Sequence, residues 1–348
     1  AGAVPGRSTT ISAAEVATSA AADEMVDFCL KGAYHTLVRS TKQTTPHTMP
    51  NIVLMKNTAC ELFTLHPDAA YQQAFGFIRQ LAISLRNCLK LKTKEQFQSV
   101  LNWPYLHCLD FWSMVLAKTC CDEREEDGPS YMRPLIYPLV QVALGVARLV
   151  PISRYFPLRL HIVRAMLRVM QAAHVYIPLA ALVLEVFESP EFQRRAKGAT
   201  LKPLDLATTF RAPVAYVRTR IYAEQLADEF AFVLHEFLAT QARSIAFPEL
   251  IIPVTTQLRR VLKTGHNARM AEALRPVLDK AQQNAVWIEQ RRQGIEFAPH
   301  DHVQVERFLV NDTAEAPLDA ALRLARKVRV QKQKLLEQNA HVVGDDEE

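Results

Sequence analysis

Glycine is scarce in this sequence, which has 10 glycines among 348 residues. So few glycines disfavour the tight turns of β-sandwiches, β-barrels and nucleotide-binding loops, whereas the abundant Ala, Leu, Gln, Glu, Arg and Lys favour helices. The motifs GxxxxGK(S/T), GxGxxG, GxSxG and HExxH do not occur, so the sequence signatures of phosphate-binding loops, nucleophile elbows and zincin sites are missing. We expect an all-α protein that is not an enzyme and uses no cofactor.

Side chains suited to redox or metal chemistry are also few. The six cysteines lie in the first 121 residues, in apolar helical surroundings and without CxxC spacing, so we expect reduced, buried thiols. Adjacent Cys120 and Cys121 could be reactive, but we favour packing roles. The cluster His300, Asp301 and His302 could ligate zinc or iron, although Asp301 is better placed to cap a helix. A helical metal-dependent hydrolase is therefore the least favoured function.

No apolar run is long enough to span a bilayer, and we find no secretory signal or lipidation motif, so a cytosolic or nuclear protein is expected. The longest run, Leu135–Val150, contains Gln141, Gly145 and Arg148 and predicts a buried helix. Pro151 separates it from a second helix with the spacing of an amphipathic surface helix. The second helix has Leu158, Ile162, Met166 and Val169 on one face and His161, Arg164 and Arg168 on another. Together the two helices form a predicted αα-hairpin.

Helical periodicity covers most of the remaining chain. Further helices are predicted over residues 24–38, 52–65, 67–91, 94–101, 105–121, 177–187, 214–241, 247–262, 267–292 and 317–338, with local kinks at Pro138 and Pro253. Helices of this length, paired at irregular intervals, predict a HEAT/armadillo-like α-solenoid of irregular helical repeats, with a non-repeating bundle as the alternative. We divide the chain into residues 1–50 (a flank with one helix and an extended loop), 51–310 (the solenoid), 311–340 (a basic helix) and 341–348 (the start of an acidic tail).

Positive charge is concentrated in the centre of the chain. Residues 131–222 contain 13 basic and 4 acidic residues, an excess of nine, whereas residues 1–130 contain 12 and 13. Basic and aromatic side chains alternate from Glu191 to Tyr222, where Phe192, Phe210, Tyr216 and Tyr222 could stack on unpaired bases. The RNA-binding candidates are Arg194, Arg195, Lys197, Lys202, Arg211, Arg218 and Arg220, with Arg164 and Arg168 from the preceding helix. Solvated arginines beside packed tyrosines, or contacts to an acidic protein surface, remain alternatives.

The last predicted helix is a second basic candidate. A weak apolar stripe of Leu318, Leu322, Ala325 and Val328 is surrounded by Arg323, Arg326, Lys327, Arg329, Lys332 and Lys334. Such a helix is marginal alone and gains order by docking. It could fold back on the solenoid, bind RNA, bind a protein partner, or simply present a solvated face.

Eight runs of the sequence, in order, resemble the nucleolar complex protein 2 family. They are residues 46–57 (PHTMPNIVLMKN), 77–90 (FIRQLAISLRNCLK), 97–112 (FQSVLNWPYLHCLDFW), 135–164 (LIYPLVQVALGVARLVPISRYFPLRLHIVR), 176–187, 201–206, 211–222 (RAPVAYVRTRIY) and 244–258 (SIAFPELIIPVTTQL). Eight ordered blocks with similar gaps are a specific signal, although the flank before Glu24 is shorter than is usual in that family.

The resemblance implies a non-enzymatic, HEAT-like assembly factor of nucleolar pre-60S particles, located in the nucleolus and nucleoplasm. Its implied partners are other nucleolar complex proteins, in a heterodimer, together with pre-ribosomal RNA, ribosomal proteins and assembly factors of the large subunit. It implies a role in maturation and intranuclear transport of the subunit precursor, with no membrane and no small-molecule substrate. A nuclear transport or adaptor solenoid that binds protein cargo without RNA is the alternative.

Overall fold

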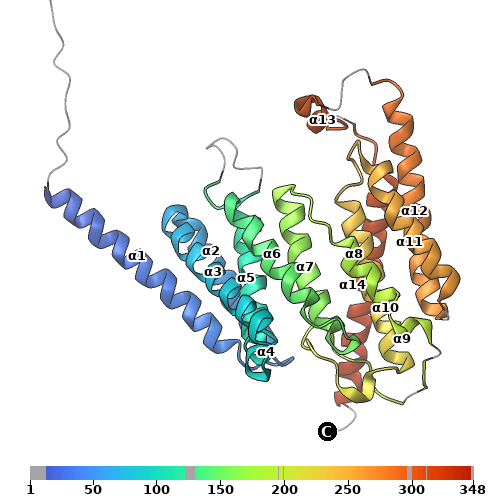
Figure 1. Ribbon diagram of the computed structural model, residues 1–348, viewed down its shortest axis with the longest axis horizontal. Helices are drawn as coiled ribbons and strands as arrows, with labels where there is room; N and C mark the ends of the chain where they lie inside the picture. The colour runs from blue at the N-terminus through green and yellow to red at the C-terminus, as the bar shows by residue number, and fades with distance from the viewer. Residues whose placement is uncertain are drawn as a thin grey trace, which may run out of the picture. The chain divides into compact units, whose positions relative to one another are not determined.

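The structure is a computed structural model that describes residues 13–121, 130–194, 196–198, 200–265, 267–295, 300–310 and 312–345 (Figure 1). Every regular element in these ranges is helical, apart from one isolated parallel β-bridge between Lys197 and Thr219. The predicted all-α class is confirmed for this part of the chain. The described residues form two compact units: unit 1 runs to Leu149 and includes Ala172–His174, and unit 2 contains Val150–Gln171 and the residues from Val175 onward.

Unit 1 is organised around a buried aromatic cluster. The fully buried Trp112 ring lies 5.2 Å from the ring of Phe63 and 5.4 Å from that of Tyr34. Beside this cluster, Lys56 is buried and pairs with Asp110. The helices of unit 1 are α1 (Ala13–Ser40), α2 (Met49–Leu65), α3 (Pro67–Leu91), α4 (Lys94–Val100), α5 (Trp103–Thr119) and α6 (Ile136–Leu149). α3 packs on α1 and α6, so one long side of α3 belongs to the core of this unit.

Unit 2 is built around α10, which contacts α8, α12 and α14. The buried face of α10 carries Leu226, Phe230, Val233, Leu234 and Phe237. The helices of unit 2 are α7 (Phe156–Ala173), which enters unit 1 only with its last residues, α8 (Ala180–Phe187), α9 (Pro190–Gln193), α10 (Arg220–Ala239), α11 (Phe247–Thr264), α12 (Ala268–Arg292), α13 (His302–Arg307) and α14 (Pro317–Asp345). Figure 1 shows α14 beside α10.

Several helix starts differ from the predicted ones for local reasons. α2 begins at Met49 rather than Ile52, because Pro50 occupies the first turn, where its missing N–H loses no hydrogen bond. α10 begins at Arg220 rather than Val214, because the Thr219 side chain accepts a hydrogen bond from the Tyr222 N–H and caps the helix there. Pro138 lies in the first turn of α6, which removes the reason for the expected kink.

Burial differs from prediction on both central helices. α6 is not buried all round, since Tyr137 is 72% exposed and Leu144 is half-buried. α7 is buried on more of its circumference than the amphipathic surface helix that the sequence predicted. Its Arg159 is only 2% exposed. The Arg159 guanidinium tolerates this burial because it donates hydrogen bonds to the Leu182 carbonyl (3.2 Å) and to Glu185 (2.9 Å).

All six cysteines are free thiols, as expected, but they are not all buried. Cys29 is exposed on the outer side of α1, and Cys121 is half-buried. Burial raises the pKa of Cys108 to about 11 and also raises the pKa of Cys120, which keeps both thiols protonated and unreactive near neutral pH.

Within the described helices, none combines the length and apolarity that crossing a membrane requires.

Candidate nucleic-acid interface

The basic segment, defined as residues 191–222, is an ordered loop that leads into the first turn of α10. The Lys197 N–H donates to the Arg218 carbonyl at 3.0 Å, and the Arg220 N–H donates to the Lys197 carbonyl at 2.8 Å. This bridge places Lys197 beside Arg218 and Arg220, although about twenty residues of chain separate them. The fold therefore gathers cations from both ends of the segment at one place.

The middle of the segment is fixed to α7 and α10. The Gln225 side chain bonds both the Leu204 N–H (2.9 Å) and the Leu204 carbonyl (3.0 Å). The Leu158 N–H donates to the Phe210 carbonyl at 3.0 Å. The Ala212 N–H donates to the Arg154 carbonyl at 2.7 Å, and the Arg154 Nε–H donates back to the Ala212 carbonyl at 3.0 Å. The backbone that carries the cations is thus held without using their charged groups.

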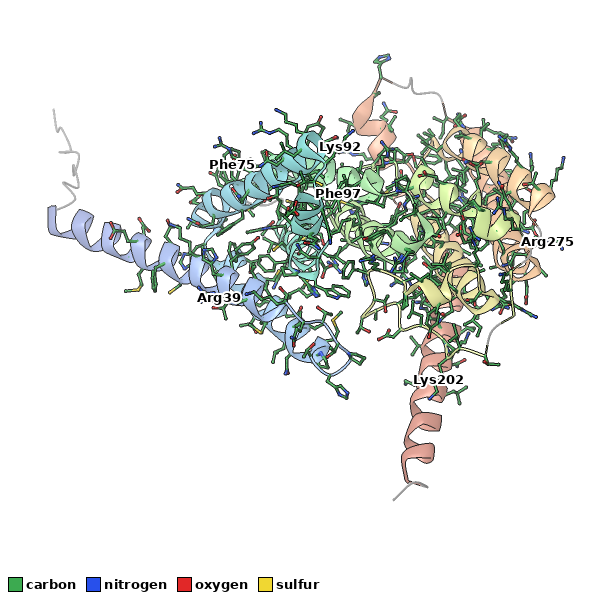
Figure 2. The ribbon with its side chains drawn as sticks, turned by 60° about the horizontal axis from the view of Figure 1, so that its bottom comes forward. Arg39, Phe75, Lys92, Phe97, Lys202 and Arg275 are labelled. Carbon is green, nitrogen blue, oxygen red and sulfur yellow. The ribbon has the colours of Figure 1, made fainter. Side chains whose placement is uncertain are left out.

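Most charged groups of the segment are exposed and form no ion pair with a described residue. Arg194, Lys197, Lys202, Arg211 and Arg218 are exposed and make no ion pair with any residue that the structure describes. Figure 2 labels Lys202 at the periphery of the molecule. Arg220 is also exposed but pairs with Glu224 at 2.7 Å, and the Arg211 guanidinium lies 5.6 Å from the centre of the Tyr155 ring. Arg195 lies outside the described residues.

The aromatic side chains of the segment serve the fold more than the surface. Phe192 is fully buried, with its ring 5.6 Å from that of Phe187. Tyr222 is also fully buried, donates a hydrogen bond to the Ser153 carbonyl (2.6 Å), and has a pKa raised by burial. Tyr216 is half-buried and donates to the Lys202 carbonyl at 3.0 Å. The hypothesis that Phe192 and Tyr222 stack on bases is wrong, so the segment is suited to phosphates rather than bases.

Arg164 is not the exposed cation that the sequence suggested. It is half-buried on α7 and pairs with Glu229 of α10, while Arg329 of α14 donates to both oxygens of the same carboxylate at 2.6 Å. Burial lowers the pKa of Arg164, and the adjacent Glu229 opposes that shift. Arg168 is also half-buried. Arg164 is therefore removed from the RNA-binding candidates, whereas Arg168 stays a prediction.

Sequence reasoning missed Glu229 and Glu236. They lie seven residues apart on one side of α10, and Arg326 and Arg329, three residues apart on α14, pair with them. The guanidinium of Arg329 also lies 4.6 Å from the centre of the Phe232 ring. The available signal was two acidic residues on one side of α10 and two basic residues on one side of α14, but many such pairs exist in this chain.

The first half of α14 folds back on unit 2, one of the alternatives left open. The Leu318 carbonyl lies 3.2 Å from His235 Nε2, and the Leu318 N–H donates to Asn284 Oδ1 at 3.4 Å. These contacts and the Arg329–Glu229 pair show that α14 runs antiparallel to α10, towards the end of α10 where the basic segment joins it. Val328, expected in the buried stripe, is 55% exposed.

The side of α14 away from its ion pairs presents a mixed apolar and basic surface over residues 324–335. Leu324, Val328 and Leu335 are 64%, 55% and 59% exposed and share the side of the helix away from the ion-paired face. Lys327, Lys332 and Lys334 are exposed and have no ion pair in the described part of the chain, whereas Arg323 pairs with Glu315 at 2.9 Å.

The metal hypothesis gains no support. Asp301 caps α13, with its side chain accepting from the Gln304 N–H at 3.2 Å, as the favoured interpretation predicted. His300 is exposed, and the side chain of His302 lies outside the described atoms. Among the residues that were described, no group of three or more His, Cys, Asp or Glu could hold a metal ion.

A family model described as the Noc2p family matches residues 24–324. The chain belongs to the Noc2p family. An uncharacterized NOC2 family protein of Schizosaccharomyces pombe is 36% identical over 316 residues, which are 90% of this chain and 45% of that relative. Nucleolar complex protein 2 of Drosophila melanogaster is 34% identical over 268 residues (77% and 34%), and nucleolar complex-associated protein 2 of Arabidopsis thaliana is 32% identical over 325 residues (93% and 42%). The chain spans less than half the length of these relatives, and the resemblance inferred from eight sequence runs is confirmed.

Proposed function

We propose that this chain is a non-enzymatic ribosome biogenesis factor, a helical scaffold that joins nucleolar precursors of the large ribosomal subunit. Membership of the Noc2p family and the names of its relatives as nucleolar complex proteins support this role. Binding other nucleolar complex proteins and pre-ribosomal RNA, the factor would support maturation and intranuclear transport of the precursor in the nucleolus and nucleoplasm.

A HEAT/armadillo-like solenoid is the architecture that we propose for this scaffold. Consecutive helices pack on one another within each unit, as α1 does on α2 in unit 1 and α11 does on α12 in unit 2. Repeated packing of neighbours is how solenoids bury their apolar faces. Small-angle scattering of the purified chain is the direct test, because a solenoid of this length gives an elongated distance distribution, whereas a compact bundle does not.

The basic segment is the observation that supports RNA binding. Five exposed cations that make no ion pair with a described residue lie on a loop whose backbone is fixed by the bridge at Lys197 and by Gln225. Phosphate contacts contribute most of the affinity of such surfaces and position the nucleic acid without reading its sequence. We therefore assign the segment to backbone phosphates of ribosomal RNA.

The outer side of α14 over residues 324–335 is the proposed docking site for a protein partner. Leu324, Val328 and Leu335 form an exposed apolar stripe, and the neighbouring lysines Lys327, Lys332 and Lys334 favour negative charge opposite them. The occupant that fits both features is an amphipathic helix with acidic flanks, supplied by another nucleolar complex protein. Leu324→Asp with Leu335→Asp should abolish that association without weakening RNA binding through the basic segment.

The decisive experiment is a salt titration of RNA binding. Arg194→Ala, Lys197→Ala and Arg218→Ala together should lower the slope of log affinity against log salt by about two units for single-stranded RNA, because three phosphate contacts are lost. The variant Arg194→Lys with Arg218→Lys retains the charges and should retain the slope. If the alanine triple keeps wild-type RNA binding but loses a protein partner, the adaptor function replaces the scaffold function.

A further inference from the structure

A second basic surface lies in unit 1. It is not evident from the nearly balanced charge of residues 1–130 taken as a whole. Between Asp68 and Glu95 the sequence contains five cations and no acidic residue. The five are Arg79, Arg86, Lys90, Lys92 and Lys94, on α3 and in the turn that joins α3 to α4. The acidic residues that balance them in a simple count lie elsewhere in the chain.

Three of these cations share one side of α3. At 3.6 residues per turn, Arg79, Arg86 and Lys90 project within about 40° of one another. The buried residues of α3 are Ala70, Ala74, Ile78, Leu81, Leu85 and Cys88, and they occupy the opposite side, where α1 and α6 pack. Arg79, Arg86 and Lys90 are all exposed. Core packing therefore fixes the direction in which the three cations point.

The cations of α3 make no ion pair with a described residue, unlike three lysines of the same unit. Lys31, Lys56 and Lys118 pair with Asp27, Asp110 and Glu61, respectively. None of the five cations between Asp68 and Glu95 makes such a pair with a described residue. The α3 group therefore combines exposure with a stretch of sequence that contains no acidic residue to balance it.

Phe75 extends the same side of α3, and the half-buried Tyr71 lies next to it at the edge of that side. Phe75 is 50% exposed and lies one turn before Arg79, and its ring is stacked on that of Tyr71 with centroids 6.4 Å apart and planes inclined by 21°. At a rise of 1.5 Å per residue, the line from Tyr71 to Lys90 is about 28 Å long. Figure 2 labels Phe75 on α3 and Lys92 just after the carboxyl end of that helix.

We propose that this side of α3 binds single-stranded RNA, with phosphates on Arg79, Arg86 and Lys90 and a base stacked on Phe75. Cations in line with exposed aromatic rings are the combination that single-stranded nucleic acids require, because every base has a face that can stack. An acidic protein surface would satisfy the cations and leave the aromatic pair without a role. The inference extends the proposed RNA-binding function to a second site, in the other unit.

The test measures binding of a uridine 20-mer and of a duplex of equal length to the full chain. Arg79→Ala with Arg86→Ala and Lys90→Ala should weaken binding of the uridine strand and lower its salt slope by about two units. Phe75→Ala should weaken the same strand roughly fivefold or more with an unchanged slope, because stacking involves no counterion release. Binding of the duplex should not respond to Phe75→Ala.

Matched controls come from α1 and from Lys42, two residues after its end. Lys31→Ala, Arg39→Ala and Lys42→Ala together remove the same net charge from exposed positions of unit 1, and Phe28→Ala removes an aromatic ring that is 74% exposed. Both control variants should change affinity less than twofold. Circular dichroism checks folding, which all these exposed alanine substitutions should preserve because alanine favours helix.

Three results would overturn the inference. They are an α3 triple variant that behaves like the α1 triple, a Phe75→Ala variant that behaves like Phe28→Ala, and loss of an acidic protein partner with RNA binding intact. The basic-segment variant is measured in parallel. Loss of binding in the α3 variants alone would support this site and reject the segment, and loss in the segment variant alone would do the reverse.

Discussion

The arginines of α14 and those of the basic segment both belong to unit 2, yet their charged groups are used differently. Arg326 and Arg329 pair with Glu236 and Glu229 of α10, whereas Arg194 and Arg218 are exposed and have no ion pair among the described residues. The difference lies in α10, whose two carboxylates face α14, while the segment is fixed through its backbone and Gln225. Positive charge forms ion pairs within unit 2 in one region and is exposed, without an ion pair to a described residue, in the other.

Removing the Glu229 carboxylate, which Arg164 and Arg329 share, should lower stability more than any other change proposed for this comparison. Glu229→Ala leaves half-buried Arg164 without its partner and releases Arg329, so unfolding free energy should fall by about 3 kcal/mol. Chemical denaturation followed by circular dichroism measures the change. The matched control is Glu224→Ala, which removes the exposed partner of Arg220 and should leave stability unchanged. Equal losses in the two variants would mean that Glu229 holds no buried network.

A smaller loss is expected from the arginines one at a time. Arg164→Ala should cost about 1.5 kcal/mol, since Glu229 keeps its bonds to Arg329 and only one half-buried pair is lost. Arg329→Ala should cost a similar amount. The double variant measures coupling: because both arginines share one carboxylate, the two losses should not add. Strict additivity would show that the two pairs act independently.

The bounds of α3 and the family could be predicted from sequence because their signals lie in short runs of residues, whereas the predicted starts of α2 and α10 were wrong by three to six residues. Pro67 and Asp68 mark the start of α3, and the predicted span of residues 67–91 is the observed one. Pairing was not predictable, because Glu229 lies 65 residues from Arg164 and 100 residues from Arg329. Helical periodicity shows which face of a helix is polar and does not show which distant carboxylate lies opposite.

Of the candidate site, the cations could be predicted from the sequence and the role of the aromatic side chains could not. The cations of the basic segment were identified from composition, and the structure places Arg194, Lys197, Lys202, Arg211 and Arg218 at the surface. Their aromatic neighbours were misjudged, because an alternating pattern does not separate a ring that stacks on a ligand from one that closes the core, as Phe192 and Tyr222 do. The α3 cations were missed because charge was summed over 130 residues instead of over single helices.

Acidification should loosen α14 while leaving the basic segment in place. Burial lowers the pKa of His235, which faces the Leu318 carbonyl, with Glu236 and Arg326 nearby. A lowered folded-state pKa means that the unfolded chain binds the proton more readily, so stability should fall as pH decreases through about 6.5. Denaturation at pH 7.5 and 5.5, compared with His235→Gln, isolates this contribution. An identical pH dependence of stability in the variant would show that His235 does not cause it.

The smallest effect on stability is expected for Arg218, where the effect on RNA binding should be clear. Arg218→Ala removes an exposed side chain with no ion pair in the described structure, so unfolding free energy should change by less than about 0.5 kcal/mol. Its backbone has a positive φ of 68°, which alanine tolerates no worse than arginine. One lost phosphate contact should lower the RNA salt slope by about one unit. Arg326→Ala is the counterpart: it should destabilise the docked α14 and leave the slope unchanged, because its guanidinium already binds Glu236. A slope that responded to Arg326 and not to Arg218 would exchange the roles of the two regions and place RNA on α14.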